Sequence, residues 1–461
     1  MPVTVRAPYD PPKQQVERGT GVNEDIRGGE AAAVRLARGA PLDEVLDVDD
    51  PAAWTGLDAG VRAWGGYGIE DLPDRAWVEA LDGATGPPGG SGTGRWMFRS
   101  SRRGPEPDHG PSVEPRLAVA LCHPDGHIRE AALARVSDRP VLLPLVVIRA
   151  ADWAAPVRDK ARELLRVGLD MRTGLALAPL ILRIGRRERG SYGVELLGAM
   201  LRRAPHGAPA TLFVHPDRTV RRFAYRLAAE ESLLSPDRFA RTAAWDDDVV
   251  VQTLCAEAAL AAVREGDGLD EVLEPLLAAR NPRTRSAGVT ALRRAGRPER
   301  ALEFLADRSA LVRACARYVV RQHGSDPLSW YRQRCAQADD PALPPGAAIG
   351  LAECGERADA EALRLLLTHP APAVRARAVA GLRTLDVTVV EDLRPLIDDP
   401  APGVVREATL ALLPSAALLP EAWLTERLTA QRPRHVRVAA ERLATAAGLV
   451  VRLPVDAERG C

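Results

Sequence analysis

The sequence is poor in lysine and in aromatic residues. Its 62 basic side chains include only two lysines, Lys13 and Lys160, and the rest are arginines. This arginine excess, with abundant Ala, Gly and Pro, is typical of a GC-rich coding bias, so a single arginine carries little functional information. Aromatic residues make up 4% of the chain, and the core must therefore be built from Ala, Leu and Val. Acidic side chains also number 62, so overall charge does not indicate a dedicated nucleic-acid or membrane protein.

The sequence also lacks paired cysteines and long apolar runs. Its six cysteines form no CxxC pair, and the amino terminus has no apolar run typical of a signal peptide. No apolar segment reaches the roughly 18 residues that a membrane-spanning helix needs. We therefore expect a reduced, cytoplasmic protein that does not bind membranes.

What the sequence does contain is a recurring frame, clearest from His369 to Leu385. A polar turn residue, His369, is followed five residues later by Val374, six later by Arg375 and nine later by Ala378. The arginine position of the frame recurs at Arg129, Arg158, Arg221, Arg313, Arg375 and Arg437, with Gln252 in one copy, a shortened copy from Asn281 to Arg285 and a copy of uncertain register after Asp399. The 308 residues from Arg129 to Arg437 hold ten intervals of about 31 residues, if two long gaps each contain a degenerate unit.

Each part of this frame has a physical role in a stack of helices. The apolar residues follow helical spacing, and the small residue lets neighbouring helices approach closely. The polar turn residue can cap the second helix of a pair, and the arginine can reach the capping group of the next unit. We therefore predict an all-α fold, an α-solenoid (superhelix) of about eleven helical-hairpin repeats with a small helical cap at its amino terminus.

This frame resembles the short bacterial HEAT repeats, of the armadillo-like helical kind, in which a turn Asp and an Arg six residues later form a ladder along the solenoid. The resemblance covers about residues 113–448. The chain departs from the family pattern where His123, His215 and His369 replace the turn Asp and where Gln252 replaces the Arg.

Composition divides the chain into five segments. We predict a flexible leader at 1–29, an acidic helical cap at 30–82, a Gly/Pro/Ser/Arg-rich linker at 83–112, the repeat solenoid at 113–448 and a tail at 449–461. In the cap, Trp54, Trp64 and Trp77 offer an apolar face for the first repeats.

Charge is distributed unevenly along this neutral chain. Residues 43–82 contain eleven acidic residues and two arginines, whereas residues 280–334 contain thirteen arginines and four acidic residues. The asymmetry favours either an intramolecular contact or two distinct binding surfaces. The candidate binding residues of the basic region are Arg280, Arg283, Arg285, Arg293, Arg294, Arg297, Arg300, Arg317 and Arg321.

No catalytic, metal or cofactor motif stands out. The glycine-rich stretch at 83–94 lacks the lysine and the preceding strand of a phosphate-binding loop. Cys122, His123 and His127 are the densest group of metal-ligand types, but His123 occupies the turn position of the repeat. Trp245 beside Asp247 is an alternative groove site, although acidic turns are ordinary caps in this repeat. We expect neither a metal nor a cofactor.

These observations favour a non-enzymatic binding scaffold that holds a protein partner on a curved helical-repeat surface. The first alternative is a nucleic-acid-binding solenoid that uses residues 280–334, with a site like that of the HEAT-like DNA glycosylases at Trp245 and Asp247. The second is an enzyme accessory of the HEAT-like lyase kind.

Overall fold

The computed structural model describes residues 28–64, 72–81, 113–204, 210–263 and 268–449, and every regular element in these ranges is helical. The chain divides into two compact units, unit 1 (Met1–Glu231) and unit 2 (Ser232–Cys461). The predicted leader, linker and tail lie almost wholly outside the described residues. Within the described ranges, no helix is both long and apolar enough to cross a membrane.

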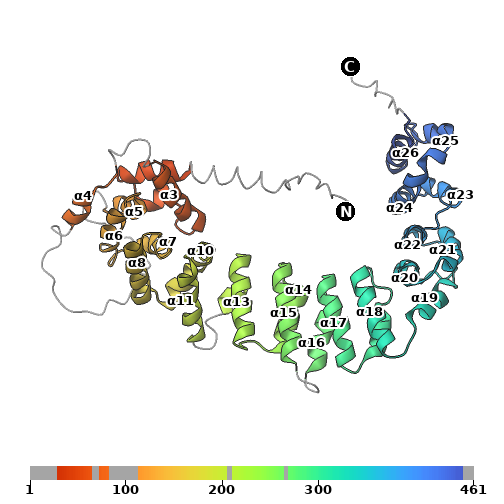
Figure 1. Cartoon of the computed structure of the whole chain (residues 1–461), viewed down its shortest axis with the longest axis horizontal. Helices are drawn as coiled ribbons and strands as arrows, with labels where there is room; N and C mark the ends of the chain where they lie inside the picture. The colour runs from red at the N-terminus through yellow and green to blue at the C-terminus, as the bar shows by residue number, and fades with distance from the viewer. Residues whose placement is uncertain (1–27, 65–71, 82–112, 205–209, 264–267, 450–461) are drawn as a thin grey trace, which may run out of the picture. The chain divides into compact units, whose positions relative to one another are not determined.

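The described residues form eleven helical hairpins that follow one another in chain order, which confirms the predicted helical-repeat fold (Figure 1). Unit 1 pairs α5 (Val113–Cys122) with α6 (Gly126–Leu133), η3 and α7 (Pro140–Leu142, Leu143–Arg149) with α8 (Ala155–Gly168), α9 and α10 (Met171–Ala176, Ala178–Ile184) with α11 (Ser191–Arg202), and α12 (Ala210–Phe213) with α13 (Arg218–Glu230). Unit 2 pairs α14 (Pro236–Trp245) with α15 (Val249–Ala262), α16 (Leu269–Ala278) with α17 (Pro282–Arg294), η4 (Pro298–Phe304) with α18 (Ala310–Gln322), and α19 (Pro327–Cys335) with α20 (Pro345–Cys354). It continues with η5, α21 and η6 (Arg357–Asp359, Ala360–Leu365, Leu366–Thr368) against α22 (Pro372–Thr384), α23 and η7 (Val390–Leu393, Arg394–Asp398) against α24 (Pro402–Leu412), and η8 and α25 (Leu413–Leu418, Glu421–Arg427) against α26 (Arg434–Ala446).

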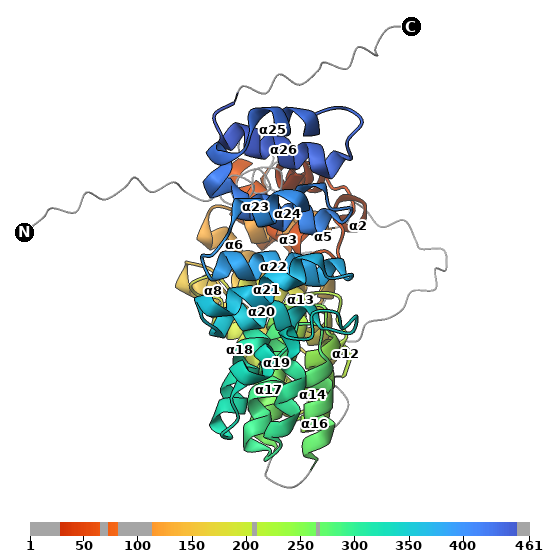
Figure 2. The same ribbon diagram turned by 90° about the vertical axis from the view of Figure 1, so that its right-hand side faces the viewer.

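Within unit 2, the second helices of the hairpins form one row. Helix α15 packs on α17, α17 on α18, α20 on α22, α22 on α24, and α24 on α26. Figure 2 shows this stacking from α17 at the bottom of the view to α26 near the top. Because equivalent positions of successive repeats lie beside one another in such a row, residues with the same place in the frame form lines along the stack.

The predicted frame explains how the hairpins pack. The small-residue position is buried in every copy of the frame that the structure describes, at Ala132, Ala161, Ala224, Cys255, Gly288, Ala316, Ala378, Ala408 and Ala440. Burial at Cys255 raises the pKa of its thiol, as expected for a packing residue rather than a nucleophile.

One copy of the frame differs in register from the prediction. Arg285 donates through Nη1 to the carbonyl of Ala279 at 2.8 Å, six residues earlier, as Arg375 does to His369. The copy is therefore not shortened, and Ala279 rather than Asn281 occupies the turn position. Asn281 instead caps α17, because its side chain accepts the Arg283 amide hydrogen at 2.9 Å.

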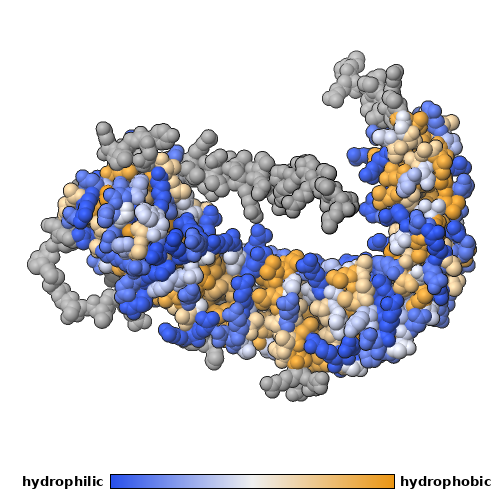
Figure 3. Space-filling model, viewed as in Figure 1, coloured by the Kyte–Doolittle hydropathy of each residue, from blue (hydrophilic) through white to orange (hydrophobic). Residues whose placement is uncertain are grey.

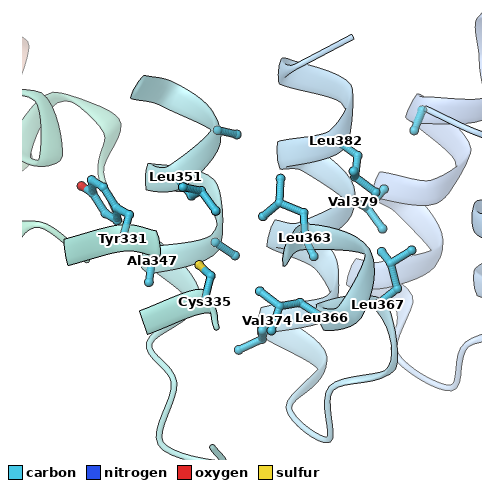
Figure 4. Close-up of a cluster of buried hydrophobic side chains, with 14 of the residues drawn as sticks. Tyr331, Cys335, Ala347, Leu351, Leu363, Leu366, Leu367, Val374, Val379 and Leu382 are labelled. Carbon is cyan, nitrogen blue, oxygen red and sulfur yellow. The ribbon is translucent and has the colours of Figure 1, made fainter. Parts of the chain in front are cut away.

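The two degenerate units are complete hairpins without the frame. In unit 2, α19 and α20 replace the expected copy, and their core joins that of the next repeat. Figure 4 shows Tyr331 and Leu351 on one side of this core and Leu363, Val374 and Leu382 on the other. These five side chains are at most 1% exposed.

The acidic cap lies on the first hairpins of unit 1. It contains a helix at residues 28–37, α2 (Leu42–Val45), α3 (Pro51–Trp64) and α4 (Arg75–Ala80). Helix α3 packs on α5, α7 and α10, and α4 packs on α6. Trp54 is 2% exposed and donates from its indole nitrogen to the Val48 carbonyl at 2.9 Å, while Arg116 of α5 stacks on the Trp77 ring.

Candidate protein-binding surfaces

A ladder of arginines links successive repeats. Arg129 donates two hydrogen bonds to Asp152, at 2.9 and 2.8 Å, and a third to the carbonyl of its own turn. Arg285 likewise donates two hydrogen bonds to Asp307, at 3.0 and 2.8 Å, and Arg375 donates two to Asp399, at 2.7 and 2.9 Å. These bidentate pairs fix the stacking of hairpins, so their arginines are not available to a partner.

The turn residue does not cap the second helix as predicted, because the N-cap lies two residues later, and the three turn histidines instead close the turn as Asp does. Nδ1 of His123, His215 and His369 accepts the amide hydrogen two residues later at 2.9, 3.0 and 3.0 Å. Asp152 accepts the equivalent hydrogen of Ala154 at 2.9 Å. His123 is therefore a turn residue whose Nδ1 is already occupied, and burial lowers its pKa, which favours the neutral form.

Gln252, the other departure from the family pattern, links two repeats through uncharged hydrogen bonds. Its amide nitrogen donates to the Asp246 carbonyl, six residues earlier, as the arginines do in other copies. Its amide oxygen accepts from the Asn281 side chain at 2.6 Å. An amide pair thus replaces the ion pair between these two repeats.

Arg313 departs from the ladder because its partner does not lie in a turn. Both Arg313 and Arg317 donate to Glu353 on α20, with Nε of Arg313 at 3.0 Å and Nη1 of Arg317 at 2.7 Å. Burial alone would raise the pKa of Glu353, but the two arginines outweigh it and the pKa is lowered. This carboxylate joins α18 to the degenerate hairpin, and the repeat frame gives no signal for it.

The structure separates the nine predicted binding arginines into two groups. Arg285 and Arg317 belong to the contacts just described, while Arg297 pairs with Asp270 and Arg300 with Glu274, both on α16, the first helix of the preceding hairpin. The remaining five are exposed and have no carboxylate partner among the described residues, namely Arg280, Arg283, Arg293, Arg294 and Arg321.

Three of these arginines share one face with exposed apolar side chains. Val250, Arg283 and Leu311 occupy the same place, four residues after the turn position, on α15, α17 and α18, and Val250 and Leu311 are 44% and 46% exposed. Two or three helical turns further along lie Arg294 on α17 and Tyr318 on α18, and the Tyr318 hydroxyl accepts from Arg293 at 2.7 Å. We name these six residues the α15–α18 face.

The α15–α18 face combines positive charge with apolar area. Apolar residues interrupt the hydrophilic surface over α14 to α16 in the view of Figure 3. Glu257, seven residues after Val250, is exposed at the α15 edge, and the three arginines of the face all lie on α17. Such a surface is complementary to a segment that carries both carboxylates and apolar side chains.

Trp245 and Asp247 lie at an exposed turn between α14 and α15. Trp245 is 74% exposed, and the Arg280 guanidinium lies 5.9 Å from its ring centre. Of the neighbouring carboxylates, Asp246 accepts the Asp248 amide hydrogen at 2.8 Å, and Asp248 caps α15 by accepting from Val250 at 2.8 Å. Two of the three consecutive acids therefore serve the turn and the helix end.

A second basic surface, which the sequence reasoning missed, lies between α24 and α26. A groove of about 490 Å³ is lined there by Arg406, Arg434, His435 and Arg442 together with Pro402, Val405, Thr409, Val438 and Ala439. Its residues come from two repeats, and only the stacking of α24 on α26 brings them together.

Comparison with known proteins adds little to this description. No protein family matches the sequence, and no similar curated protein was found. Among solved structures, Kap121p is similar over 92% of this chain and 54% of its own, with 12% identity and a TM-score of 0.30. The chain thus spans about half the length of Kap121p. A structure of microtubule polymerases with tumor overexpressed gene (TOG) domain arrays matches over 86% of this chain and 92% of its own, with 10% identity and a TM-score of 0.21. At these scores the likeness carries no argument, and the helical-repeat fold rests on the hairpins themselves.

Proposed function

We propose that the protein is a non-enzymatic scaffold that holds an acidic segment of a protein partner on the α15–α18 face. The observation that supports this is the combination on one face of Arg283 and Arg294, which lack carboxylate partners, with Leu311 and Tyr318, which are 46% and 45% exposed. Exposed apolar side chains beside arginines are typical of the residues that dominate protein–protein contacts.

The charge of the basic region favours a protein over nucleic acid. Six of its thirteen arginines form ion pairs, at Arg285, Arg297, Arg300, Arg313, Arg317 and Arg332. Four of their partners, Asp270, Glu274, Glu353 and Asp359, lie outside residues 280–334. The net positive charge of this surface is therefore smaller than the number of arginines in the sequence suggests. Fewer cations are left to contact the phosphates of a nucleic acid.

Charge reversal at Arg283 tests the proposal. We expect the Arg283→Glu variant of the full chain to bind a fluorescent peptide of alternating Glu and Leu about tenfold more weakly than the wild type, because an attraction becomes a repulsion. The matched control is Arg238→Glu, at an exposed arginine of α14 in the other row of helices, and it should bind like the wild type.

Fluorescence anisotropy over a salt series provides the measurement. An oligonucleotide of equal charge, tested in parallel, should bind more weakly than the peptide and lose its affinity more steeply with salt. Equal affinities of both variants, or tighter binding of the oligonucleotide, would reject the proposal.

A further inference from the structure

Unit 1 contains an apolar pocket between the cap and the hairpins beneath it. The pocket has a volume of about 160 Å³, and its walls include Val48 and Trp54 from the cap, Leu143 from α7 and Leu180 from α10. A cavity of about 150 Å³ with apolar walls is large enough for a benzene ring. The pocket therefore has the size of one aromatic side chain.

One polar group inside the pocket has no partner. Thr173 is 4% exposed and lines the cavity. Its amide donates to Asp170 at 2.8 Å, but its hydroxyl forms no hydrogen bond with the residues that the structure describes. Because Thr173 lines the cavity, a ligand that brings a hydrogen-bonding group into the pocket can bond to this hydroxyl.

The rim of the pocket is negatively charged. Asp49 lines the opening, and Asp43, Glu44, Asp47 and Asp50 are exposed on the same short segment of the cap. Asp47 and Asp50 also accept backbone hydrogens, at 3.2 and 2.8 Å. Arg183 and Arg186 lie beside Asp50 in an adjoining hollow. The carboxylates of Asp43, Glu44 and Asp49 have no cationic partner in the described part of the chain, so this side of the rim attracts positive charge.

We propose that this pocket is a docking site for a basic segment of a protein partner. An aromatic side chain with a polar tip, Tyr or Trp, enters the cavity and bonds to the Thr173 hydroxyl, while flanking Arg or Lys residues face the carboxylates of the rim. Charge complementarity selects this occupant over an acidic one. The site is opposite in charge to the α15–α18 face and independent of it, so the chain carries docking sites for two different segments.

The test uses the full chain and a fluorescent peptide in which one Tyr is flanked by arginines. Ala176, the exposed last residue of α9, lies at the edge of the pocket, so Ala176→Phe should block the opening with little effect on folding. We expect this variant to bind the peptide at least about tenfold more weakly. Ala278→Phe, at the exposed end of α16, is the matched control and should bind normally.

The hydroxyl and the rim are tested separately. Wild-type protein should prefer the Tyr peptide over its Phe counterpart, and Thr173→Val should lose that preference while retaining the fold. Neutralising the rim with Asp43→Asn, Glu44→Gln and Asp49→Asn should flatten the salt dependence of binding.

Three results would overturn the proposal. Equal binding of the Tyr peptide and an Ala peptide would show that the affinity depends on charge alone and that no aromatic side chain enters the pocket. Equal binding by Ala176→Phe and Ala278→Phe would place the peptide elsewhere. Binding seen only after Trp96 and Phe98 of the arginine-containing linker at 83–112 are replaced by Ser would identify that linker, not a partner, as the occupant.

Discussion

Replacing Asp152 with Ala is expected to lower the stability of unit 1 by about 3–5 kcal/mol, the cost of leaving a buried charge without its partner. The Asp152 carboxylate is fully buried and accepts two hydrogen bonds from Arg129, one from Arg149 and one from the Ala154 amide. Arg149 also pairs with Asp58 of the cap. The substitution therefore removes the carboxylate on which two buried arginines converge.

The matched control lies in the adjoining helix. Glu163 pairs with Arg166 on α8, where both side chains are about 60% exposed, and Glu163→Ala should cost less than about 1 kcal/mol. Urea titration combined with hydrogen exchange of the α5–α8 amides provides the measurement, because repeat proteins can unfold in parts. Equal stability of the two variants would mean that the buried network contributes nothing to unit 1.

The same substitution should change the acid sensitivity of unit 1. Burial alone would raise the pKa of Asp152, but the hydrogen bond from Arg129 and the charge of Arg149 outweigh it, and the pKa is lowered. A lowered carboxyl pKa contributes stability above the ordinary value of about 3.9, and this contribution is lost as the pH falls through the folded-state pKa. The wild type should therefore lose more stability than Asp152→Ala on acidification below about pH 4.

Replacing Gly346 with Ala is expected to destabilise unit 2 by about 3 kcal/mol, at the upper end of the cost of overpacking. A Cβ at this position would lie 2.0 Å from the backbone oxygen of Ala306. Backbone cannot rotate away as a side chain can, so the start of α20 would have to move away from the preceding repeat.

The chain provides a matched control for this substitution. Pro402-Gly403 opens α24 as Pro345-Gly346 opens α20, but a Cβ at Gly403 would meet no atom within 4 Å. Gly403→Ala should be neutral or stabilise the protein by up to about 1 kcal/mol. Thermal unfolding of both variants checks the prediction, and equal melting temperatures would show that the repeats do not approach as closely as described.

These two glycines show where sequence reasoning reaches its limit. Both follow a proline at a helix start, and only the three-dimensional packing gives Gly346 a close neighbour. The repeat frame was predictable because burial of Val374 and Ala378 imposes a helical period on the sequence itself. The register at Ala279 was missed because Asn281-Pro282 resembles a turn start, whereas the carbonyl that Arg285 contacts belongs to a residue of no special type.

The candidate surfaces were predictable only in part. The sequence identified Arg283 and Arg294, but it could not separate them from Arg297 and Arg300, whose partners Asp270 and Glu274 lie on the first helix of the preceding hairpin. Which arginines are neutralised depends on the direction in which each side chain points across the stack. The pocket of unit 1 had no sequence signal, since its walls come from three separated segments.

Site-specific photo-cross-linking tests the central claim most directly. Leu311 on α18 and Leu365 on α21 are both exposed leucines of unit 2, at 46% and 63%, but they lie on different rows of helices. With benzoylphenylalanine at either position and the acidic Glu/Leu peptide as the ligand, the scaffold account predicts efficient cross-linking from position 311 and little from position 365. Equal yields from the two positions, or a higher yield from position 365, would contradict the assignment of the α15–α18 face as the binding surface.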